Sequence, residues 1–468
     1  MTRGLLAYGA YVPYARLERS AIAAALGVAP LSGTRAVASY DEDTTSMGVE
    51  AARPALRDAR ATPELLYFAT ADPAYLDKTN ATAIHAALDL PASTMAVDVA
   101  GAVRSAAGAM RAALDARVPA LAVVSDIRTG LPGGADEREG GDAAAAFLIG
   151  EGEVLAEPIG QASATAEFLD RWRVPGEAYS RQWEERFGEF AYVPLGERAL
   201  AEALKQAGIT VPAVDHLIVA GPHARSNKRV AASAGVRKEA LADDRTSLVG
   251  NTGAAHAGLL LADVLDRAQA EQVIAVVSLA DGADVTVWRT TAALGRRGAR
   301  RAVAAQLTSP GRVSYATFLT WRGLLRREPP RRPDPQPPDA PAAARAEAWK
   351  YAFTGSRCQA CGARHVPPQR VCVKCHAIDR MTPEPMRDVP AAIATYTVDR
   401  LAYSMSPPVV VAVIDFEGGG RFQCEMADVD PAAVKIGDRV ELTFRRLYTA
   451  GGIHNYFWKA RPIRGGQG

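Results

Sequence analysis

Residues 357–375 read RCQACGARHVPPQRVCVKC, and their four cysteines decide how this part of the chain folds. Cys358 and Cys361 form one C-x2-C pair, and Cys372 and Cys375 form a second pair after ten residues. Each pair turns so that two thiolates converge, and two pairs supply the tetrahedral sulfur shell that Zn2+ prefers. We therefore predict a structural zinc site, with redox-active dithiols and unliganded cysteines as the alternatives.

The composition is that of an ordinary globular protein. Its 468 residues include 54 Lys and Arg against 52 Asp and Glu, for a net charge of +2, and 48% of them are hydrophobic. A chain of this length has room for about three domain-sized units. The charge balance indicates no bulk electrostatic partner, and in particular no nucleic acid.

Cysteine usage and the length of the apolar runs indicate the cellular compartment in which the protein is expected to reside. The fifth cysteine, Cys424, stands alone, which favours metal binding in a reducing compartment over a disulfide framework. His365 and His376 lie near the pairs and are expected to be surface histidines. The start of the chain lacks the continuous apolar centre of a signal peptide, and no apolar run approaches the roughly 20 residues of a membrane span. We expect a cytoplasmic protein without a membrane helix.

The sequence on either side of the cysteine pairs differs in character. Residues 326–341, RREPPRRPDPQPPDAP, predict an exposed and semi-rigid connector, because proline favours extended polyproline geometry. Residues 389–463 alternate β-branched residues with Gly and Asp turns, which is typical of a small antiparallel barrel.

The first 289 residues alternate short runs of β-forming residues with Ala-rich helical stretches, which predicts an α/β unit with mostly parallel strands. Helices are expected over residues 105–116, 197–206 and 253–267. Strands are expected over residues 65–69, 95–100, 120–125, 144–149, 217–220 and 273–278.

The C-terminal part resembles the DUF35 family, a rubredoxin-like zinc ribbon joined to an OB-fold. The stretches WKYAFTGSRC (349–358) and VKIGDRVELTF (434–444) carry the resemblance, with the ribbon over 346–385 and the barrel over 386–468. An OB-fold that binds nucleic acid needs a basic groove with aromatic residues, whereas DFEGGG (415–420) and CEMADVD (424–430) are acidic. The resemblance implies contact with acyl-CoA or with a partner enzyme instead.

The large unit resembles the thiolase superfamily, in the branch of hydroxymethylglutaryl-CoA synthase and ketoacyl synthase III. The stretches that carry this resemblance are SYDEDTTSMGVEAAR (39–53), DRWRVPGEAYS (170–180), GPH (221–223) and VGNTGAA (249–255). The resemblance implies a five-layer αβαβα fold of two similar halves, 1–165 and 166–290, followed by a basic, Pro-rich linker over 291–345. It also implies a homodimer, with the site between the halves.

Members of this superfamily use a Cys nucleophile at the start of a buried helix, where the helix dipole helps to lower the pKa of the thiol. An ungapped match puts Asp98 on the family's strand acid and Val103 on the nucleophile. Val103 has no nucleophilic atom, and only a shift of two residues reaches the hydroxyl of Ser105. Arg104 and Val103 are expected to contact substrate.

Two other positions of the family's site keep their residue types. His223 and Asn251 match the His and Asn that point donors at a thioester carbonyl and stabilise the enolate or oxyanion formed there. A loop histidine and a turn asparagine are the structural alternatives. His256, close to Asn251, is expected to be a core or interface residue.

The family's general acid/base position, after the strand at 65–69, is also changed. Ala71 occupies it, and the adjacent Asp72 is a candidate acid or a turn residue. Thiolase-like aldolases associated with DUF35 proteins use Tyr as acid and base. Here Tyr75 and Tyr179 are candidates for such roles, Tyr179 also as a substrate contact, with ordinary packing as the alternative.

Three functions are compatible with this pattern. The first is an enzyme for acyl-CoA or acyl-carrier thioesters that performs aldol, retro-aldol or decarboxylation chemistry through an oxyanion hole, without an acyl-enzyme. The second is a hydroxymethylglutaryl-CoA synthase-like acyltransferase with a nonstandard nucleophile such as Ser105. The third is a noncatalytic scaffold that presents substrate to a partner thiolase. The cluster RRGARR (296–301) could meet the phosphates of CoA or be a solvated surface run.

Overall fold

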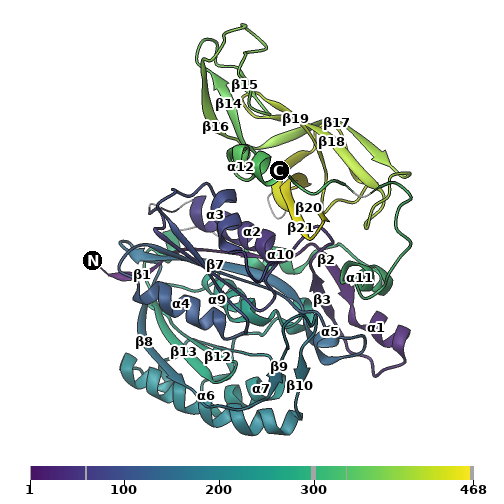
Figure 1. The fold of residues 1–468 in the computed structure, drawn as a ribbon. Helices are drawn as coiled ribbons and strands as arrows, with labels where there is room; N and C mark the ends of the chain where they lie inside the picture. The colour runs from purple at the N-terminus through teal and green to yellow at the C-terminus, as the bar shows by residue number, and fades with distance from the viewer. Residues whose placement is uncertain (1, 58, 60, 297–301, 334, 464–468) are drawn as a thin grey trace.

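The computed structural model describes residues 2–463 except 58, 60, 297–301 and 334. Figure 1 shows an α/β unit at one end of the molecule, with the barrel and the ribbon at the other. The α/β unit has a nine-stranded sheet in the order β11-β12-β13-β8-β1-β7-β6-β4-β5.

Two halves with the same strand order make up this sheet. In the first half, three parallel strands are followed by two antiparallel ones: β5 (Met95–Ala100), β4 (Leu65–Thr70), β6 (Ala120–Ile127), β7 (Asp142–Glu151) and β1 (Arg3–Tyr11). The second half repeats the order with β11 (His216–Ala220), β12 (Val273–Leu279), β13 (Ala283–Thr290) and β8 (Ala156–Ala164).

The strand of the second half that would match β5 is reduced to a single bridge between Leu217 and Leu241. A single residue pair, Leu5 with Ala156, joins the two halves in the sheet. The six strands and three helices expected from the sequence are all present, and the helix expected over 197–206 extends to Glu185–Ala207. The repeated order explains the two-half architecture.

Helices complete the five layers. The outer face of the first half carries α2 (Thr44–Arg57) and α3 (Ala81–Ala87), and that of the second carries α6 (Glu185–Ala207) and α7 (Ala224–Ser233). Between the halves lie α4 (Ser105–Asp115) and α9 (His256–Leu265). The inward face of α4 is formed by Ala106, Ala109 and Ala113, whose small side chains let the helix approach the sheet closely.

A smaller subdomain lies beside the sheet and includes part of the predicted linker. It comprises β2 (Ala15–Glu18), α1 (Arg19–Leu26), β3 (Thr34–Val37) and α11 (Tyr315–Trp321), whereas α10 (Val303–Leu307) packs on α9 and β1. Phe318 is fully buried against Leu17 and Ile22. The structure therefore differs from the predicted linker over 291–345, because apolar side chains at helical spacing dock α10 and α11 on the α/β unit. Residues 324–333 and 335–339 contain no helix or strand.

The C-terminal part is a ribbon followed by a closed barrel. The ribbon sheet has β14 (Thr354–Cys358) between β15 (Arg364–His365) and β16 (Met381–Pro385), and follows α12 (Ala340–Arg345) and α13 (Glu347–Lys350). The barrel order is β19-β18-β17-β20-β21, from β17 (Ala391–Asp399), β18 (Val409–Phe416), β19 (Arg421–Glu425), β20 (Arg439–Ala450) and β21 (Ile453–Pro462). A parallel bridge between Met426 and Ala460 closes it, as expected for an OB-fold.

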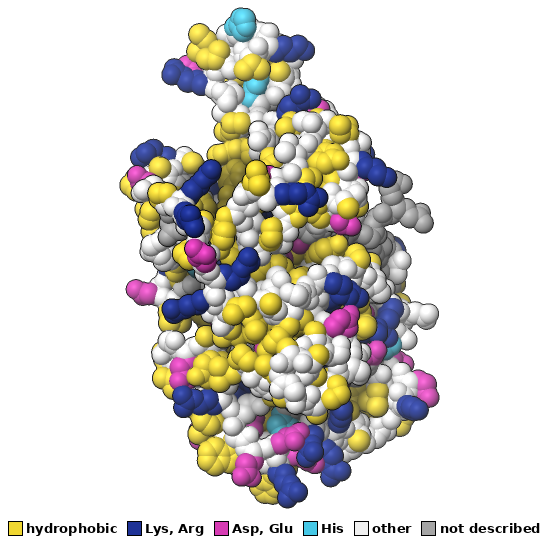
Figure 2. Space-filling model, turned by 90° about the vertical axis from the view of Figure 1, so that its right-hand side faces the viewer, with side chains coloured by type: hydrophobic (Ala, Val, Ile, Leu, Met, Phe, Trp, Pro, Cys, Tyr) yellow, Lys and Arg dark blue, Asp and Glu magenta, His cyan; other side chains and the backbone are white. Residues whose placement is uncertain are grey.

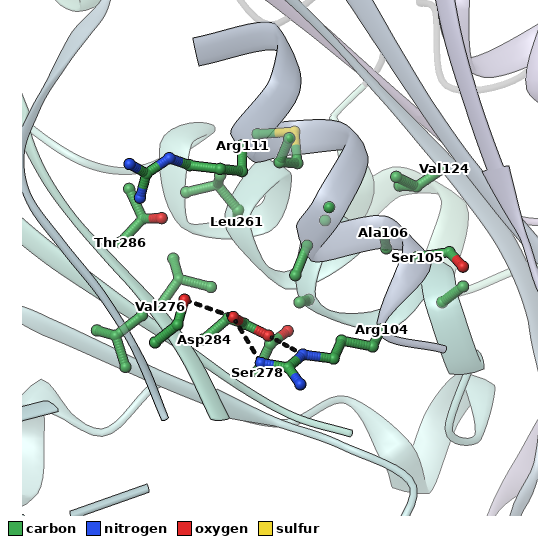
Figure 3. Close-up of a pocket in the computed structure, with 18 of the residues that line it drawn as sticks. Arg104, Ser105, Ala106, Arg111, Val124, Leu261, Val276, Ser278, Asp284 and Thr286 are labelled. Atoms are coloured by element: carbon green, nitrogen blue, oxygen red, sulfur yellow. Dashed lines mark hydrogen bonds and ion pairs between the residues drawn. The ribbon is translucent and has the colours of Figure 1, made fainter. Parts of the chain in front are cut away.

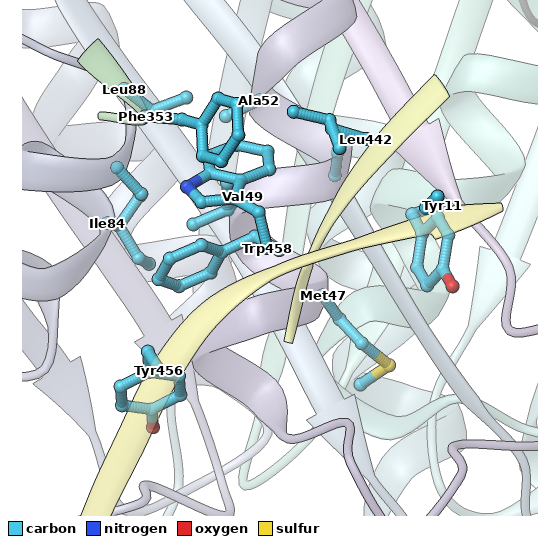
Figure 4. Packing of buried hydrophobic residues seen from close by; sticks show 14 of the residues in the cluster. Tyr11, Met47, Val49, Ala52, Ile84, Leu88, Phe353, Leu442, Tyr456 and Trp458 are labelled. Atoms are coloured by element: carbon cyan, nitrogen blue, oxygen red, sulfur yellow. The ribbon is translucent and has the colours of Figure 1, made fainter. Parts of the chain in front are cut away.

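The barrel packs directly on α2. Figure 4 shows Trp458, Tyr456 and Leu442 of the barrel lying over Met47 and Val49 of α2, within one continuous hydrophobic cluster. Around this apolar contact the junction contains buried charges from both units. Barrel cations contact carboxylates of residues 41–50, so the junction is polar as well as apolar.

Candidate functional site

A small polar pocket lies over the beginning of α4, at the position predicted for the nucleophile. Val103 and Gly101 form its floor, and Gly101 adopts a φ of +117°, which a residue with a side chain rarely tolerates. The pocket has a volume of about 70 Å³. Its other walls come from the ends of β4 and β6, from α5 (Ala135–Glu139), and from the stretch that includes β9 (Arg171–Trp172).

Arginine and aspartate side chains line this pocket in unusual number. Arg128 donates to Asp136 at 3.0 Å and lies 3.6 Å from Asp126, and Arg171 also donates to Asp136. Arg173 lies 3.5 Å from Asp72, at the more exposed side of the pocket. The described residues that line the pocket above the predicted nucleophile position therefore include three arginines and four aspartates, the fourth being Asp281.

Two of these acids have pKa values raised by burial. Asp126 is fully buried, and loss of solvation raises its pKa to about 6 although Arg128 and the Ala254 N–H, 2.9 Å away, oppose the rise. Loss of solvation also raises the pKa of Asp72, again against the attraction of Arg173. A carboxyl group with a raised pKa can donate and accept protons in catalysis.

The structure orients His223 toward α6. Its Nδ1 accepts from the Ser226 N–H at 3.1 Å, so Nε2 carries the hydrogen and donates to the Glu185 carbonyl at 2.8 Å. Gly188 is close enough that a Cβ there would lie 2.7 Å from Nε2. His223 is therefore the cap of α7, while its neighbour Pro222 lines the pocket.

The side-chain amide of Asn251 also makes hydrogen bonds within the loops, through both its nitrogen and its oxygen. Its Nδ2 donates to the Gly221 carbonyl at 2.7 Å, and its Oδ1 accepts from the Gly253 N–H at 3.0 Å. These bonds tie the loop before α9 to the loop of Pro222. His256, one turn further on, is fully buried as expected, and burial lowers its pKa to about 4.

The two candidate tyrosines lie in different places. The Tyr75 hydroxyl accepts from the His454 N–H of the barrel at 2.7 Å, and the two rings lie 4.7 Å apart. Tyr179 is half-buried and adjacent to Ser180, which lines the pocket. Of the predicted site residues, only Val103 and Asp72 themselves line the polar pocket.

A second and larger cavity lies on the other side of the start of α4 (Figure 3). It has a volume of about 560 Å³, lies between α4, α9 and the second half of the sheet, and is mostly apolar. Ser105 lines it, with its hydroxyl accepting weakly from the Ala102 N–H at 3.4 Å. Arg104 closes one end by donating to Asp284 at 2.8 Å and to the Asp281 carbonyl at 2.7 Å.

The predicted metal site is assembled in the ribbon. The four cysteine sulfurs lie within 4.8 Å of one another, with Cys358 and Cys375 3.7 Å apart and Cys361 and Cys372 3.5 Å apart. A tetrahedron with Zn–S distances near 2.3 Å requires sulfurs about 3.8 Å apart, so the residues fit zinc. Figure 2 shows the ribbon as a narrow projection at the top of the molecule.

One histidine near the metal site differs from the sequence expectation. His376 is exposed, but His365 is buried. The prediction of a surface histidine was wrong for His365, because β15 places its side chain inside the ribbon.

Sequence reasoning missed the groups that fill the polar pocket. Arg171 and Arg173 stand in the stretch DRWRVPGEAYS, where their side chains look like ordinary charges. Asp126 stands at the end of an apolar strand, where a buried polar residue is a usable signal. The RRGARR cluster gives no further information, because residues 297–301 lie outside the described part and Arg296 pairs with Glu153.

Comparisons with solved structures define the class. The chain matches "MvaS in complex with 3-hydroxy-3-methylglutaryl coenzyme A" with a TM-score of 0.58 and 20% identity, over 72% of this chain and 95% of that one. It matches 3-oxoacyl-[acyl-carrier-protein] synthase III from Aquifex aeolicus with a TM-score of 0.52 and 19% identity, over 61% and 99%. The large unit therefore has the thiolase fold. Residues 347–378 match the model "ChsH2, rubredoxin-like zinc ribbon domain", and residues 388–445 match "ChsH2, C-terminal OB-fold domain".

Curated relatives define the family. The hydroxymethylglutaryl-CoA synthase of Methanocaldococcus jannaschii is 30% identical over 61% of this chain and 88% of its own length. That of Thermococcus onnurineus is 31% identical over 60% and 83%. The chain belongs to the hydroxymethylglutaryl-CoA synthase family. None of the helices in the described part is long and apolar enough to cross a membrane.

Proposed function

We propose that this chain acts on a coenzyme A or carrier-linked acyl thioester, and that it makes or breaks a carbon–carbon bond without an acyl-enzyme. The observation that carries the proposal is Val103 at the start of α4, beneath a pocket that contains Asp126 and Asp72. The family supplies a thioester substrate, whereas the pocket supplies acids, bases and cations but no nucleophile at that position.

Retro-aldol cleavage fits this set of groups. A carboxylate removes the proton from a β-hydroxyl, the bond between the α and β carbons breaks, and the β carbon becomes a carbonyl. The electron pair forms a thioester enolate, which then takes a proton at the α carbon. Asp126 or Asp72 would move these protons, and the Arg173 guanidinium would stabilise the enolate oxygen. The aldol direction uses the same groups in reverse.

The predicted donors have a supporting part in this proposal. The Nε2–H of His223 and one of the two Nδ2 hydrogens of Asn251 are used by backbone carbonyls, so both residues support the loop that carries Pro222. The 560 Å³ cavity shares Ala102 and Asp281 with the polar pocket and has the size of a site for an acyl chain. Strand β5 is an open, half-exposed sheet edge, which supports the expected homodimer.

The test compares turnover with covalent loading. Wild-type protein incubated with β-hydroxyacyl-CoA is expected to release a ketone or aldehyde and a shorter acyl-CoA, while mass spectrometry finds the chain unmodified. Asp126→Asn should lower turnover by roughly a hundredfold or more, as for other acid–base groups. An acyl adduct on wild-type protein that disappears in Ser105→Ala would instead establish acyl transfer through Ser105.

A scaffold function is the second candidate. The occupied Nε2–H of His223 favours it, as does the ribbon, whose Val373 is 75% exposed. In that case the purified chain binds thioesters without converting them and co-purifies with a cysteine-bearing thiolase. Turnover by the isolated chain would exclude a purely presenting role.

A further inference from the structure

We propose that the tip of the zinc ribbon binds a second copy of this chain, by inserting into a cleft between the barrel and the α/β unit of that copy. The ribbon tip comprises residues 370–380. The junction cleft lies between residues 305–310, which include the end of α10, and residues 426–440 of the barrel. This contact does not depend on the reaction that the chain performs.

The ribbon tip presents aliphatic side chains to solvent. Val371, Val373 and Ile378 are 46%, 75% and 63% exposed. Val371 and Ile378 face each other in an antiparallel bridge, so their side chains lie together on one side of the tip. Val373 stands between Cys372 and Cys375, whose sulfurs belong to the metal site. The tip is therefore a small, preorganised apolar surface at the end of a projection, where Figure 2 shows hydrophobic and basic side chains together.

Positive charge accompanies these aliphatic side chains. Lys374 and Arg380 lie within two residues of them in the sequence, and both are exposed. Neither cation forms an ion pair with another described residue, whereas the acid of the tip, Asp379, is paired with Arg370 at 2.9 Å. A matching surface must therefore supply apolar area together with carboxylates.

The junction cleft offers an apolar interior of suitable size. It has a volume of about 500 Å³, and most of its lining residues are apolar, such as Ile393, Met426 and Val434. Ile463 also lines it and is 40% exposed, so the cleft is open to solvent. Because a cavity of about 150 Å³ holds a benzene molecule, the cleft has room for the three aliphatic side chains of the ribbon tip.

Two carboxylates of the cleft have no cation partner among the described residues. Asp430 and Asp438 line the cleft and are exposed, and each uses one oxygen to accept a backbone N–H. The other two charged residues of the lining, Asp428 and Arg439, already have ion-pair partners. The cleft therefore combines two negative charges with apolar surface, which complements the two cations and the aliphatic side chains of the ribbon tip.

The ribbon tip points away from the junction cleft of its own chain. Figure 1 shows the ribbon strands β14, β15 and β16 beyond the barrel, whereas α10 lies on the side of the α/β unit. The occupant of the cleft is therefore the tip of a second copy. Because each copy provides one tip and one cleft, reciprocal insertion yields a closed pair with two identical contacts.

Carbodiimide cross-linking of the full chain tests this contact, because the reagent joins an amine to a carboxylate only where the two groups touch. In a mixture of isotopically heavy and light chains, we expect an amide between Lys374 of one chain and Asp430 or Asp438 of the other. Sedimentation velocity measures the association. Ile378→Asp should weaken it at least about 100-fold, because burial of one aliphatic side chain is worth roughly tenfold or more and each pair contains two contacts.

The matched control is Leu401→Asp, because Leu401 is 97% exposed in the loop between β17 and β18 and belongs to neither surface. This variant should associate like wild type. Lys374→Glu and Asp430→Lys should each weaken the association, and the double variant should recover most of it, which separates a lost contact from a folding defect. A wild type that forms no intermolecular link, or that associates no more strongly than Ile378→Asp, overturns the proposed contact.

Discussion

Replacing Arg445 with Met should open the junction between the barrel and α2. Arg445 is fully buried on β20 and faces three carboxylates, Asp41 at 3.4 Å, Glu42 at 2.8 Å and Asp428 at 2.5 Å. Methionine fills much of the same space but removes the positive charge. The substitution therefore tests the electrostatic part of the junction.

The expected loss of stability follows from the buried carboxylates that remain after the substitution. Lys459 still lies 2.9 Å from Asp41, and Arg461 lies 3.9 Å from Asp428, so Glu42 is the carboxylate that loses its cation. Breaking a buried ion pair at one partner costs about 3–5 kcal/mol. This is a large part of the roughly 5–15 kcal/mol that stabilises a typical domain.

Native-state hydrogen exchange of the β20 and β21 amides measures the opening free energy directly. The matched control is Arg439→Met on the same strand, because Arg439 is 53% exposed and its pair with Glu417 should contribute less than about 1 kcal/mol. Burial raises the pKa of Glu42, so a proton can neutralise the carboxylate left by Arg445→Met. The deficit should therefore shrink from pH 8 to pH 5. Equal effects of the two substitutions would refute the reasoning.

Three further predictions concern the two sites. Cys375→Ser should abolish the one zinc per chain that metal analysis of wild type should find, whereas Cys424→Ser should retain it, because Cys424 lies in the barrel core. The pKa of Asp126 is raised from 3.8 to about 6, so its contribution to stability is present below pH 4 and is lost as pH rises through 6. Asp126→Asn should thus be about 3 kcal/mol more stable than wild type at pH 7.5 in urea titrations and equal to it near pH 4. Gly188→Ala puts a Cβ 2.6 Å from the His223 ring and should destabilise the fold by about 1–3 kcal/mol, unlike Gly295→Ala, which meets open space.

Much of the fold could be predicted because its signals are local. The C-x2-C pairs fix the ribbon by spacing alone, and the apolar runs of β6 and β12 mark buried strands. The α10 and α11 helices were missed because each is short and lies in a stretch dominated by arginine and proline. Their apolar faces can be interpreted only when the partner surfaces are known, which are α9 and β1 for α10 and β2 and α1 for α11.

The candidate site shows the limit of such reasoning. The loss of a nucleophile at Val103 is visible in the sequence, since it requires only one aligned position. The direction in which the His223 ring donates is not visible in the sequence, because it depends on the closeness of Gly188, which lies on a different helix. Arg128 and Arg171 look like ordinary charges, and only the tertiary structure places both on Asp136.

The barrel and the polar pocket are connected through one short loop. The Asp72 carbonyl accepts from the Thr44 hydroxyl at the start of α2, and the Tyr75 hydroxyl accepts from the His454 N–H at the β20–β21 turn. The loop that brings Asp72 to the pocket is therefore held on one side by the helix that carries the barrel and on the other by the barrel itself. Because the buried charges around Arg445 fix the barrel on α2, a change at the junction reaches Asp72 through two hydrogen bonds. This is a physical reason for the barrel to be part of the same chain as the thiolase fold, since its position sets the geometry of an acid in the pocket.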